Sequence, residues 1–225
     1  MAKSPYTVLL GAMDQEIVAL LEAASIEKTE NWHGWELHFG TWSGVSVIIT
    51  RSGVGKVFAA MIMQHLVDTY LVDRVIFSGV AGAIATDLEP GDLVISEDLV
   101  HHDMDVTGLG FAPGRIPFTD YHFFAADQTM LERASEVLLE KGKLRKGRIG
   151  TGDQFITEKG KLPELGLDAV DMEGCAVAQV CTVQKIPFLI IRIISDRADG
   201  SADKDFLTNL SLYAARSIKV IDALI

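Results

Sequence analysis

Two acidic side chains near the C-terminal end of the chain lie beside apolar segments, where burial of a carboxylate is energetically unfavourable. The segment DMEGCAVAQV (171–180) has the composition of a helix, and the apolar strand FLIIRIISD (188–196) that follows it ends in acid. Glu173 and Asp196 are thereby directed toward one pocket. A buried carboxylate is unfavourable unless it is paired, hydrogen-bonded or protonated, and such groups concentrate at functional sites. The pattern therefore indicates acid–base chemistry.

A third carboxylate, Glu16, lies in the first turn of a predicted helix directly after the first apolar strand. Negative charge is favourable at a helix N-terminus, so a structural role would explain Glu16 by itself. Asp14 can serve as the N-cap, however, which leaves Glu16 free for another role. Capping also explains Glu173 and Asp196 one at a time. Capping does not explain why three acids, Arg192 and several glycine-rich segments all occur at the ends of predicted strands.

Three glycine-containing segments follow predicted strands. RSGVGKV (51–57) would let backbone amides approach a ligand, but it lacks the first Gly and the Ser or Thr of a Walker A loop. SGVAGAI (78–84) fails the spacing of a dinucleotide-binding loop, although it suits a backbone platform for a flat base or a sugar. In RIGTGDQFI (148–156), Phe155 either stacks on a base or packs in the core. None of the three predicts a nucleotide cofactor.

The segment His101 to Asp105 contains two histidines and two aspartates, which are common metal ligands. Consecutive residues of an extended strand point to opposite faces, and no pair of histidines has the i, i+4 spacing of a helical metal site. We therefore expect no metal and no cofactor.

The elements that must position these residues alternate along the chain. Apolar runs rich in β-branched residues predict strands at 6–13, 45–50, 74–82, 92–100 and 188–195, and helical periodicity predicts helices at 14–24, 57–71, 127–142, 172–184 and 206–225. This alternation predicts an α/β three-layer sandwich with a central mixed twisted sheet. Ligands of such sheets bind at the carboxyl ends of the strands. The irregular segment 108–121 is expected to lie over that site.

Composition narrows the function classes. With 225 residues and 48% hydrophobic content, the chain is expected to form a single domain, 1–225. The net charge of −11 argues against a nucleic-acid partner. The two cysteines, Cys175 and Cys181, form neither a disulfide framework nor a metal-binding spacing. The apolar runs are too short to cross a bilayer, and no signal peptide is recognised. We expect a cytoplasmic protein that binds no membrane.

Several of these segments, taken in order, resemble one enzyme family. They are GAMDQE (11–16), SGVGKV (52–57), GVAGAI (79–84), HHDMDVT (101–107), TGDQFI (151–156), DMEGCAVAQVC (171–181) and RIISDRAD (192–199). Together they resemble the 5′-methylthioadenosine/S-adenosylhomocysteine nucleosidases from about residue 6 to the C-terminus. The resemblance implies a nucleoside phosphorylase-like fold. It also implies hydrolysis of the N-glycosidic bond of these two nucleosides, with 5′-deoxyadenosine as a further substrate, to release adenine.

The resemblance also implies a role for each acid. Asp196 is the general acid that protonates adenine N7, with Ser195 holding its orientation, and Glu16 is the base that activates water. Glu173 accepts the ribose hydroxyls, and Arg192 organises the carboxylates. The other positions implied to contact substrate are Met13, Val54, Val80, Ala81, Gly82, Phe155, Ile156, Met172 and Phe206. Family members are homodimers in which the neighbouring chain closes the pocket for the 5′ tail, and Val106 and Leu109 match the positions that do so.

These roles agree with elementary chemistry. A carboxylate that accepts two ribose hydroxyls lies near the positive charge that develops on the sugar and stabilises it. Protonating a purine at neutral pH requires a buried carboxylic acid that keeps its proton. In inverting glycosidases, one carboxyl group protonates the leaving group and a second activates water on the opposite face of the sugar, which is the same arrangement.

Three other functions remain open from the sequence. A nucleosidase for aminodeoxyfutalosine, a menaquinone precursor, would use the same catalytic residues. A purine nucleoside phosphorylase is less favoured, because Val80 stands where related phosphorylases place a Ser or Thr for phosphate. A non-catalytic nucleoside-binding protein would not need Glu16 or Asp196.

Overall fold

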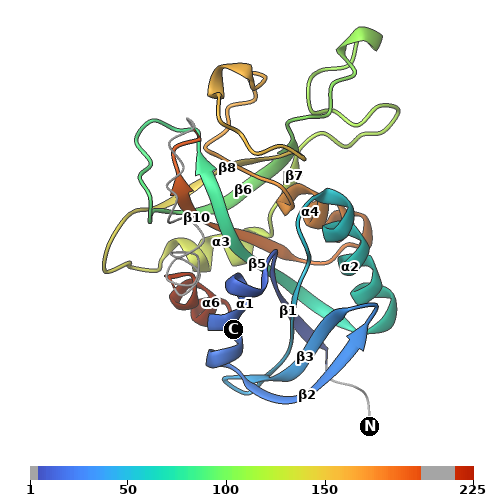
Figure 1. Ribbon diagram of the computed structural model, residues 1–225, viewed down its shortest axis with the longest axis vertical. Helices are drawn as coiled ribbons and strands as arrows, with labels where there is room; N and C mark the ends of the chain where they lie inside the picture. The colour runs from blue at the N-terminus through green and yellow to red at the C-terminus, as the bar shows by residue number, and fades with distance from the viewer. Residues whose placement is uncertain (1–4, 199–215) are drawn as a thin grey trace.

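The computed structural model describes residues 5–198 and 216–225, and these form a mixed β-sheet covered by helices on both faces (Figure 1). The strands are β1 (Tyr6–Gly11), β2 (Ser25–Trp32), β3 (Trp35–Trp42), β4 (Val45–Arg51), β5 (Val72–Ala83), β6 (Leu93–His101), β7 (Phe124–Ala125), β8 (Leu144–Thr151), β9 (Ala169–Asp171) and β10 (Phe188–Asp196). The α-helices are α1 (Asp14–Ala23), α2 (Lys56–Thr69), α3 (Gln128–Ser135), α4 (Gly174–Gln184) and α6 (Ile218–Leu224), and short 3₁₀ turns lie at Thr107–Leu109 and Lys159–Lys161.

The sheet runs in the order β10-β6-β8-β9-β5-β1-β4-β3-β2, with β7 added on β6. Because β10 pairs with β5 as well as with β6, the five strands β5, β9, β8, β6 and β10 close into a ring. The strands β4, β1, β5 and β10 are parallel neighbours, so their carboxyl ends meet at one edge. This edge is where the sequence predicts the site.

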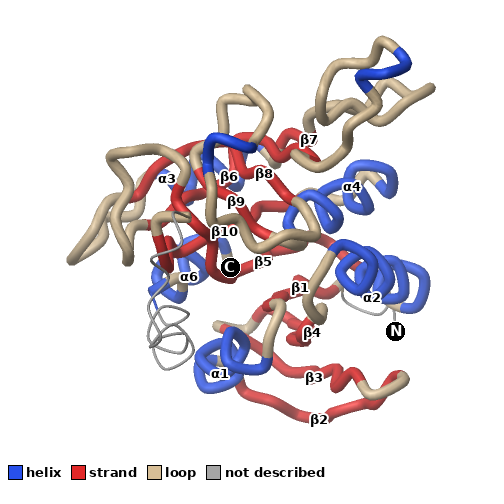
Figure 2. The backbone as a smooth tube through the Cα atoms, turned by 45° about the horizontal axis from the view of Figure 1, so that its top comes forward, coloured by secondary structure: helices blue, strands red, loops and turns tan. Residues whose placement is uncertain are grey.

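Two apolar cores, one on each face of the sheet, hold the three layers together. On one face, α2 and α4 pack against the sheet through Ala59, Ile62, Met63, Leu66, Cys175, Val177, Ala178 and Cys181. On the other, α1, α3 and α6 pack through Ile17, Leu20, Met130, Leu131, Ala134, Val220, Ile221 and Leu224 (Figure 2). The predicted α/β fold with a central mixed sheet is confirmed, whereas closure of part of the sheet into a ring was not predicted.

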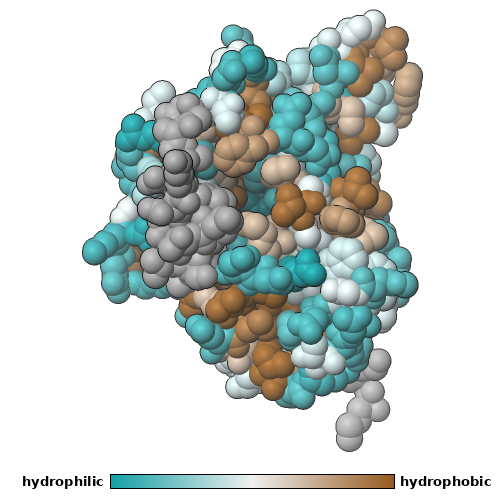
Figure 3. All heavy atoms as spheres, in the orientation of Figure 1, coloured by the Kyte–Doolittle hydropathy of each residue, from teal (hydrophilic) through white to brown (hydrophobic). Residues whose placement is uncertain are grey.

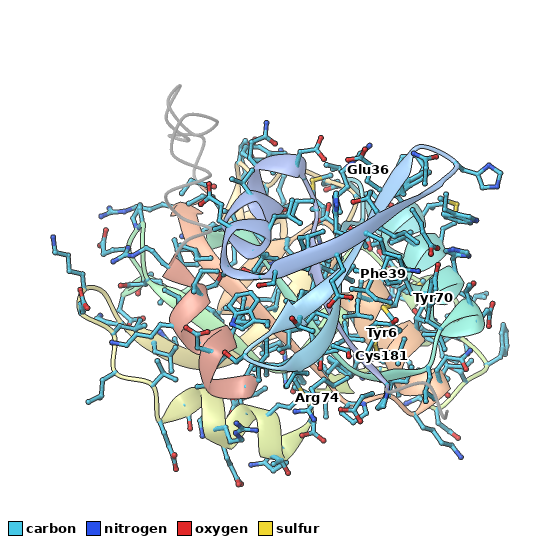
Figure 4. All side chains as sticks on the ribbon, turned by 90° about the horizontal axis from the view of Figure 1, so that it is seen from below. Tyr6, Glu36, Phe39, Tyr70, Arg74 and Cys181 are labelled. Atoms are coloured by element: carbon cyan, nitrogen blue, oxygen red, sulfur yellow. The ribbon has the colours of Figure 1, made fainter. Side chains whose placement is uncertain are left out.

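A β-hairpin formed by β2 and β3 is absent from the sequence prediction. Strand β2 (SIEKTENW) is exposed along almost its whole length, so it shows none of the apolar alternation from which strands are recognised. An edge strand with Lys28 and Glu30 on it is protected against pairing with another sheet. Beneath the hairpin, Tyr6, Phe39 and Tyr70 make edge-to-face contacts, well away from the carboxyl ends of the strands (Figure 4).

Helix boundaries also differ from the prediction. The helix predicted at 127–142 ends at Ser135, and of the one predicted at 206–225 the described part is Ile218–Leu224. The segment 102–123, between β6 and β7, projects from the body as an arm, drawn in green at the upper right of Figure 1. The expectation that residues 108–121 cover the site of their own chain is therefore wrong, because none of them lines it. None of the described helices is long and apolar enough to cross a membrane.

Candidate active site

A cavity of about 180 Å³ opens at the carboxyl ends of β1, β5 and β10. Its lining consists of Ala12, Met13, Glu16, Val54, Val80, Ala81, Gly82, Gln154, Phe155, Ile156, Val170, Asp171, Met172, Glu173, Ser195 and Asp196. Twelve of the fifteen predicted site residues are in this set. Segments far apart in the chain thus meet around the three carboxylates.

The remaining three predicted residues lie elsewhere. Arg192 is fully buried behind the cavity, where its Nε donates a hydrogen bond to Asp171, one of the lining carboxylates. Val106 lies on the projecting arm and does not line the cavity of its own chain. Phe206 lies outside the described residues.

Glu16 is held in one position by backbone donors. Its Oε2 accepts hydrogen bonds from the N–H groups of Ala12 (2.5 Å) and Met13 (3.0 Å), and its Oε1 accepts one from Val80 (3.0 Å). Burial raises the pKa of Glu16 above its usual range, while the Arg192 charge and these backbone donors act in the opposite direction. The bond from Met13 also stabilises the N-terminus of α1. Met13, not the expected Asp14, is the N-cap residue, and Glu16 accepts its N–H. Glu16 therefore has a structural role at the start of α1, and its position in the cavity leaves it available as a base.

Glu173 precedes the first turn of α4 and is 6% exposed. Its Oε1 accepts a hydrogen bond from the N–H of Gly55 (2.8 Å), and its Oε2 has no protein donor in the described part of the chain. Burial and the nearby Asp171 charge raise the pKa of Glu173 to about 8, against the influence of Gly55 and Arg192. One oxygen is thus fixed on the glycine-rich loop, and the other is left for hydroxyl groups in the cavity.

Asp196 ends β10 and is oriented by its neighbours in sequence. Its Oδ1 accepts a hydrogen bond from the N–H of Ala198 (2.8 Å), and the Ser195 hydroxyl lies 2.8 Å from its Oδ2. The same hydroxyl lies 3.2 Å from the carbonyl oxygen of Ala81. The serine can donate to the carboxylate or, when it donates to Ala81 instead, accept from the carboxylic acid. Both protonation states of Asp196 are accommodated, as a group that gives up a proton requires.

Asp171 is a buried acid of the site to which the sequence analysis gave no role. Its Oδ2 accepts from Arg192 Nε (2.8 Å) and from the N–H of Gly174 (3.1 Å), and its Oδ1 accepts from the Thr151 hydroxyl (2.5 Å). Both charged side chains of the Asp171–Arg192 pair are 1% exposed. Because Asp171 neutralises Arg192, the guanidinium can lie among the carboxylates at a tolerable desolvation cost.

The predicted base-binding residues line the open side of the cavity. Phe155 is 59% exposed, so the alternative that it packs in the core is wrong. His101 and His102, which were considered as metal ligands, are buried instead, and His101 Nε2 lies 2.9 Å from the side-chain oxygen of Gln179. In the described ranges, no group of His, Cys, Asp and Glu has the arrangement of a metal site.

Comparisons with known proteins agree with this geometry. A family model described as the phosphorylase superfamily matches residues 6–225. The chain belongs to this superfamily. A 5′-methylthioadenosine/S-adenosylhomocysteine nucleosidase of Tolumonas auensis is 37% identical over 224 residues, covering 96% of this chain and 97% of that protein.

Solved structures of the superfamily have the same fold. A nucleosidase of the same name from Colwellia psychrerythraea, in complex with adenine, has a TM-score of 0.91 and 33% identity, covering 99% of this chain and 95% of that one. The futalosine hydrolase of Helicobacter pylori has a TM-score of 0.89 and 30% identity, covering 98% and 97%. The predicted nucleoside phosphorylase-like fold is thereby confirmed.

The pKa of Glu173 predicts how the stability of this superfamily member varies with pH. Between the ordinary value of 4.5 and about 8, the folded state binds a proton that the unfolded state has lost. The free energy of unfolding therefore falls as the pH rises through that window, by up to roughly 5 kcal/mol for this group. In Glu173→Gln this contribution is absent. Urea unfolding of both proteins at pH 5.5 and pH 7.5 measures the difference.

The comparison isolates Glu173, because Glu16 and the buried histidines titrate in both proteins. We expect the wild type to lose more stability than Glu173→Gln between the two pH values. Equal losses in the two proteins would show that Glu173 is already ionised at pH 5.5.

Proposed function

We propose that the protein hydrolyses the N-glycosidic bond of 5′-methylthioadenosine and S-adenosylhomocysteine, releasing adenine and the 5′-substituted ribose. The observation that carries the proposal is the meeting of three buried carboxylates, Glu16, Glu173 and Asp196, in one cavity with an exposed aromatic ring. The names of the nucleosidases that match almost the whole chain support the same activity.

The geometry supports a separate role for each acid. Asp196, with Ser195 beside it, protonates N7 of the adenine, so that the base leaves as a neutral molecule. As the bond to the ribose lengthens, positive charge develops on the sugar. This charge favours the ionised form of Glu173, which stabilises the sugar while accepting the ribose hydroxyls. Glu16 takes a proton from a water molecule, whose oxygen bonds to the sugar carbon that adenine leaves.

The surroundings of Glu16 favour water over phosphate as the nucleophile. Val80 offers no side-chain hydroxyl to an anion, and Arg192 is paired with Asp171 and only 1% exposed. Four acidic side chains line the cavity, and their charges oppose entry of a phosphate dianion. This arrangement favours hydrolysis over phosphorolysis within a superfamily named for phosphorylases.

Adenine release in phosphate-free buffer tests the proposal. We expect turnover of both substrates without phosphate, and no increase in rate when phosphate is added. Absence of product from both would leave the non-catalytic nucleoside-binding protein as the better explanation. Strict dependence on phosphate would instead identify a phosphorylase.

A second candidate function rests on the futalosine hydrolase of similar structure. The catalytic cavity would serve aminodeoxyfutalosine equally, because adenine and ribose are the parts that it contacts. The values of kcat/KM for this substrate, methylthioadenosine and adenosylhomocysteine, measured side by side, decide between the two functions.

We also propose that the protein works as a homodimer in the cytoplasm. Apolar side chains gather over α2 and α4 (Figure 3), where Val57, Phe58, Met61 and Val183 are exposed. The projecting arm carries two further exposed apolar residues, Leu109 and Phe118, and would bring Val106 to the pocket of the neighbouring chain. Sedimentation as a monomer at micromolar concentration would exclude the dimer.

The proposed cytoplasmic location rests on the cysteines. The buried free thiols of Cys175 and Cys181 fit a reducing compartment.

A further inference from the structure

The loop that carries Phe155 is not fixed by packing in a core. Residues 152–158 follow β8 without helix or strand, and the Phe155 side chain is exposed. In the described part of the chain, every hydrogen bond that residues 153–157 make goes to Lys56 or Asp103. The position of the proposed base-binding residues therefore depends on these two side chains and their partners.

Lys56, Asp103 and Asp153 form a compact network of charges. The ammonium nitrogen of Lys56 lies 2.7 Å from both carboxylate oxygens of Asp103 and 3.8 Å from Oδ2 of Asp153. The N–H of Asp153 donates to Asp103 Oδ2 (3.0 Å), and the N–H of Lys56 donates to Asp153 Oδ1 (2.9 Å). Each residue of the network contacts the other two.

The Lys56–Asp103 pair at the centre of the network is shielded from solvent. Its side chains are 22% and 18% exposed, whereas ion pairs between fully solvated side chains are weak. Burial raises the pKa of Asp103, but the hydrogen bonds from Lys56 and from the Asp153 N–H outweigh it and hold this pKa below its usual range. Asp103 is therefore ionised at neutral pH, and the hydrogen bonds that it accepts are charge-assisted.

The three residues come from three separate segments. Lys56 begins α2 directly after the glycine-rich loop, whereas Asp103 lies two residues beyond the end of β6 and Asp153 two residues beyond the end of β8. Strands β6 and β8 are parallel neighbours, so their carboxyl ends bring the two aspartates together. The network thus joins the base-binding loop to the glycine-rich loop.

Gly55 connects the network to the ribose side of the cavity. Its N–H donates to Glu173 Oε1 (2.8 Å), and the next residue, Lys56, donates its own N–H to Asp153. Gly55 has a φ of +93°, which favours glycine, and an added side chain there would meet Asp153 Oδ1 at 3.3 Å. Two successive backbone amides therefore hold Glu173 and the loop of Phe155 at a fixed spacing.

We propose that Lys56, Asp103 and Asp153 are positioning residues, which hold the base-binding loop against the glycine-rich loop and thereby set the affinity of the site for adenine. None of the three lines the catalytic cavity, so they act through Phe155 and Ile156 rather than on the substrate. The inference rests on the proposed nucleosidase function and adds three residues to it.

A matched pair of aspartate variants tests this assignment. In Asp103→Asn, the side chain presents one oxygen and one NH₂ group, so one of the donors that face it loses its acceptor. We expect the dissociation constant of adenine, measured by calorimetric titration, to rise about tenfold, because a charge-assisted hydrogen bond is lost.

Asp98→Asn is the control variant. Asp98 accepts two hydrogen bonds from the Arg148 guanidinium, and the two side chains are 23% and 30% exposed. This pair also joins β6 to β8, but neither partner lines the cavity or contacts residues 153–157. The dissociation constant of adenine should equal that of the wild type.

The steady-state constants separate positioning from a general loss of structure. Glu16 and Asp196 are held by contacts outside the network, to Val80 and Ala198 among others. In Asp103→Asn, kcat for methylthioadenosine should therefore stay within about threefold of the wild type, while KM rises by the same factor as the dissociation constant of adenine.

Charge repulsion gives a second readout. Lys56→Met leaves the carboxylates of Asp103 and Asp153 close together without a cation, so we expect a larger loss of adenine affinity than in Asp103→Asn. Adding Asp103→Asn to Lys56→Met removes this repulsion, and the double variant should bind adenine more tightly than Lys56→Met alone. Lys56→Arg keeps the charge and should keep most of the affinity. Losses that add in the double variant would contradict an ionic network.

Three results would overturn the positioning role. Folded Asp103→Asn could bind adenine as tightly as the wild type, Asp98→Asn could lose as much affinity, or kcat could fall in Asp103→Asn while KM is unchanged. Failure of the proposed function is a separate result, in which the wild type binds adenine but releases none from methylthioadenosine.

Discussion

Asp196→Asn lowers kcat for methylthioadenosine by about 10³-fold and leaves substrate binding measurable, because the loss of a general acid costs 10²- to 10⁴-fold. The amide has nearly the shape of the carboxyl group and still accepts the bond from Ala198. It can also donate a hydrogen bond to a ring nitrogen, so the base still binds, but it cannot transfer a proton. Single-turnover adenine release gives the chemical rate, and calorimetric titration with the substrate gives the affinity.

Two further variants make this result specific. Ser195→Ala removes one of the two contacts that orient Asp196, and we expect a loss of only about tenfold. Asp73→Asn changes a half-exposed carboxylate at the opposite end of β5 and should leave kcat at its wild-type value. If Asp196→Asn keeps a rate within tenfold of the wild type, Asp196 is not the acid.

The positions of the three acids were predictable because each lies at an element boundary that the sequence marks strongly. The runs before Glu16 and Asp196 are apolar and β-branched, and parallel strands of this kind bring their carboxyl ends together. Once these strands share a sheet, the acids that follow them share a cavity. This inference needs the order of the elements but not their exact boundaries.

Asp171 was missed because its role depends on partners that are distant in the chain. Thr151 and Arg192 are each about twenty residues away, on two different strands. One signal was available: like Asp196, Asp171 ends a short apolar strand in acid. The resemblance implies roles for its neighbours Met172 and Glu173 but none for Asp171. Pairing with Arg192 is visible only when β9 and β10 are seen in one ring of strands.

The hairpin and the arm were unpredictable for a different reason: their packing is marginal or absent within one chain. Strand β2 is exposed and polar, and the arm around Leu109 and Phe118 packs little of itself on its own body. Sequence periodicity reports burial in a core, so segments outside the core give no periodic signal.

Glu16→Gln is expected to lower kcat by about 10³-fold, because the base that takes the proton from water is lost. The same change also weakens the fold. Glu16 accepts bonds from backbone N–H groups at both of its oxygens, and a glutamine presents an oxygen to one side only. One buried donor is left facing an NH₂ group, at a cost of about 1–3 kcal/mol in the free energy of unfolding.

Activity and stability must therefore be measured together. Glu22→Gln, an exposed change on the same helix, is the matched control, and we expect it to alter neither quantity. Glu16→Ala removes both oxygens and leaves space for a small acid, so added formate should restore part of its activity if the missing group is a base. Formate can accept a proton but cannot restore a displaced helix. Two results together would contradict this role. They are a folded Glu16→Ala protein that formate does not rescue, and a Glu16→Gln protein whose rate is within tenfold of the wild type. Water activation would then belong to another residue of the cavity.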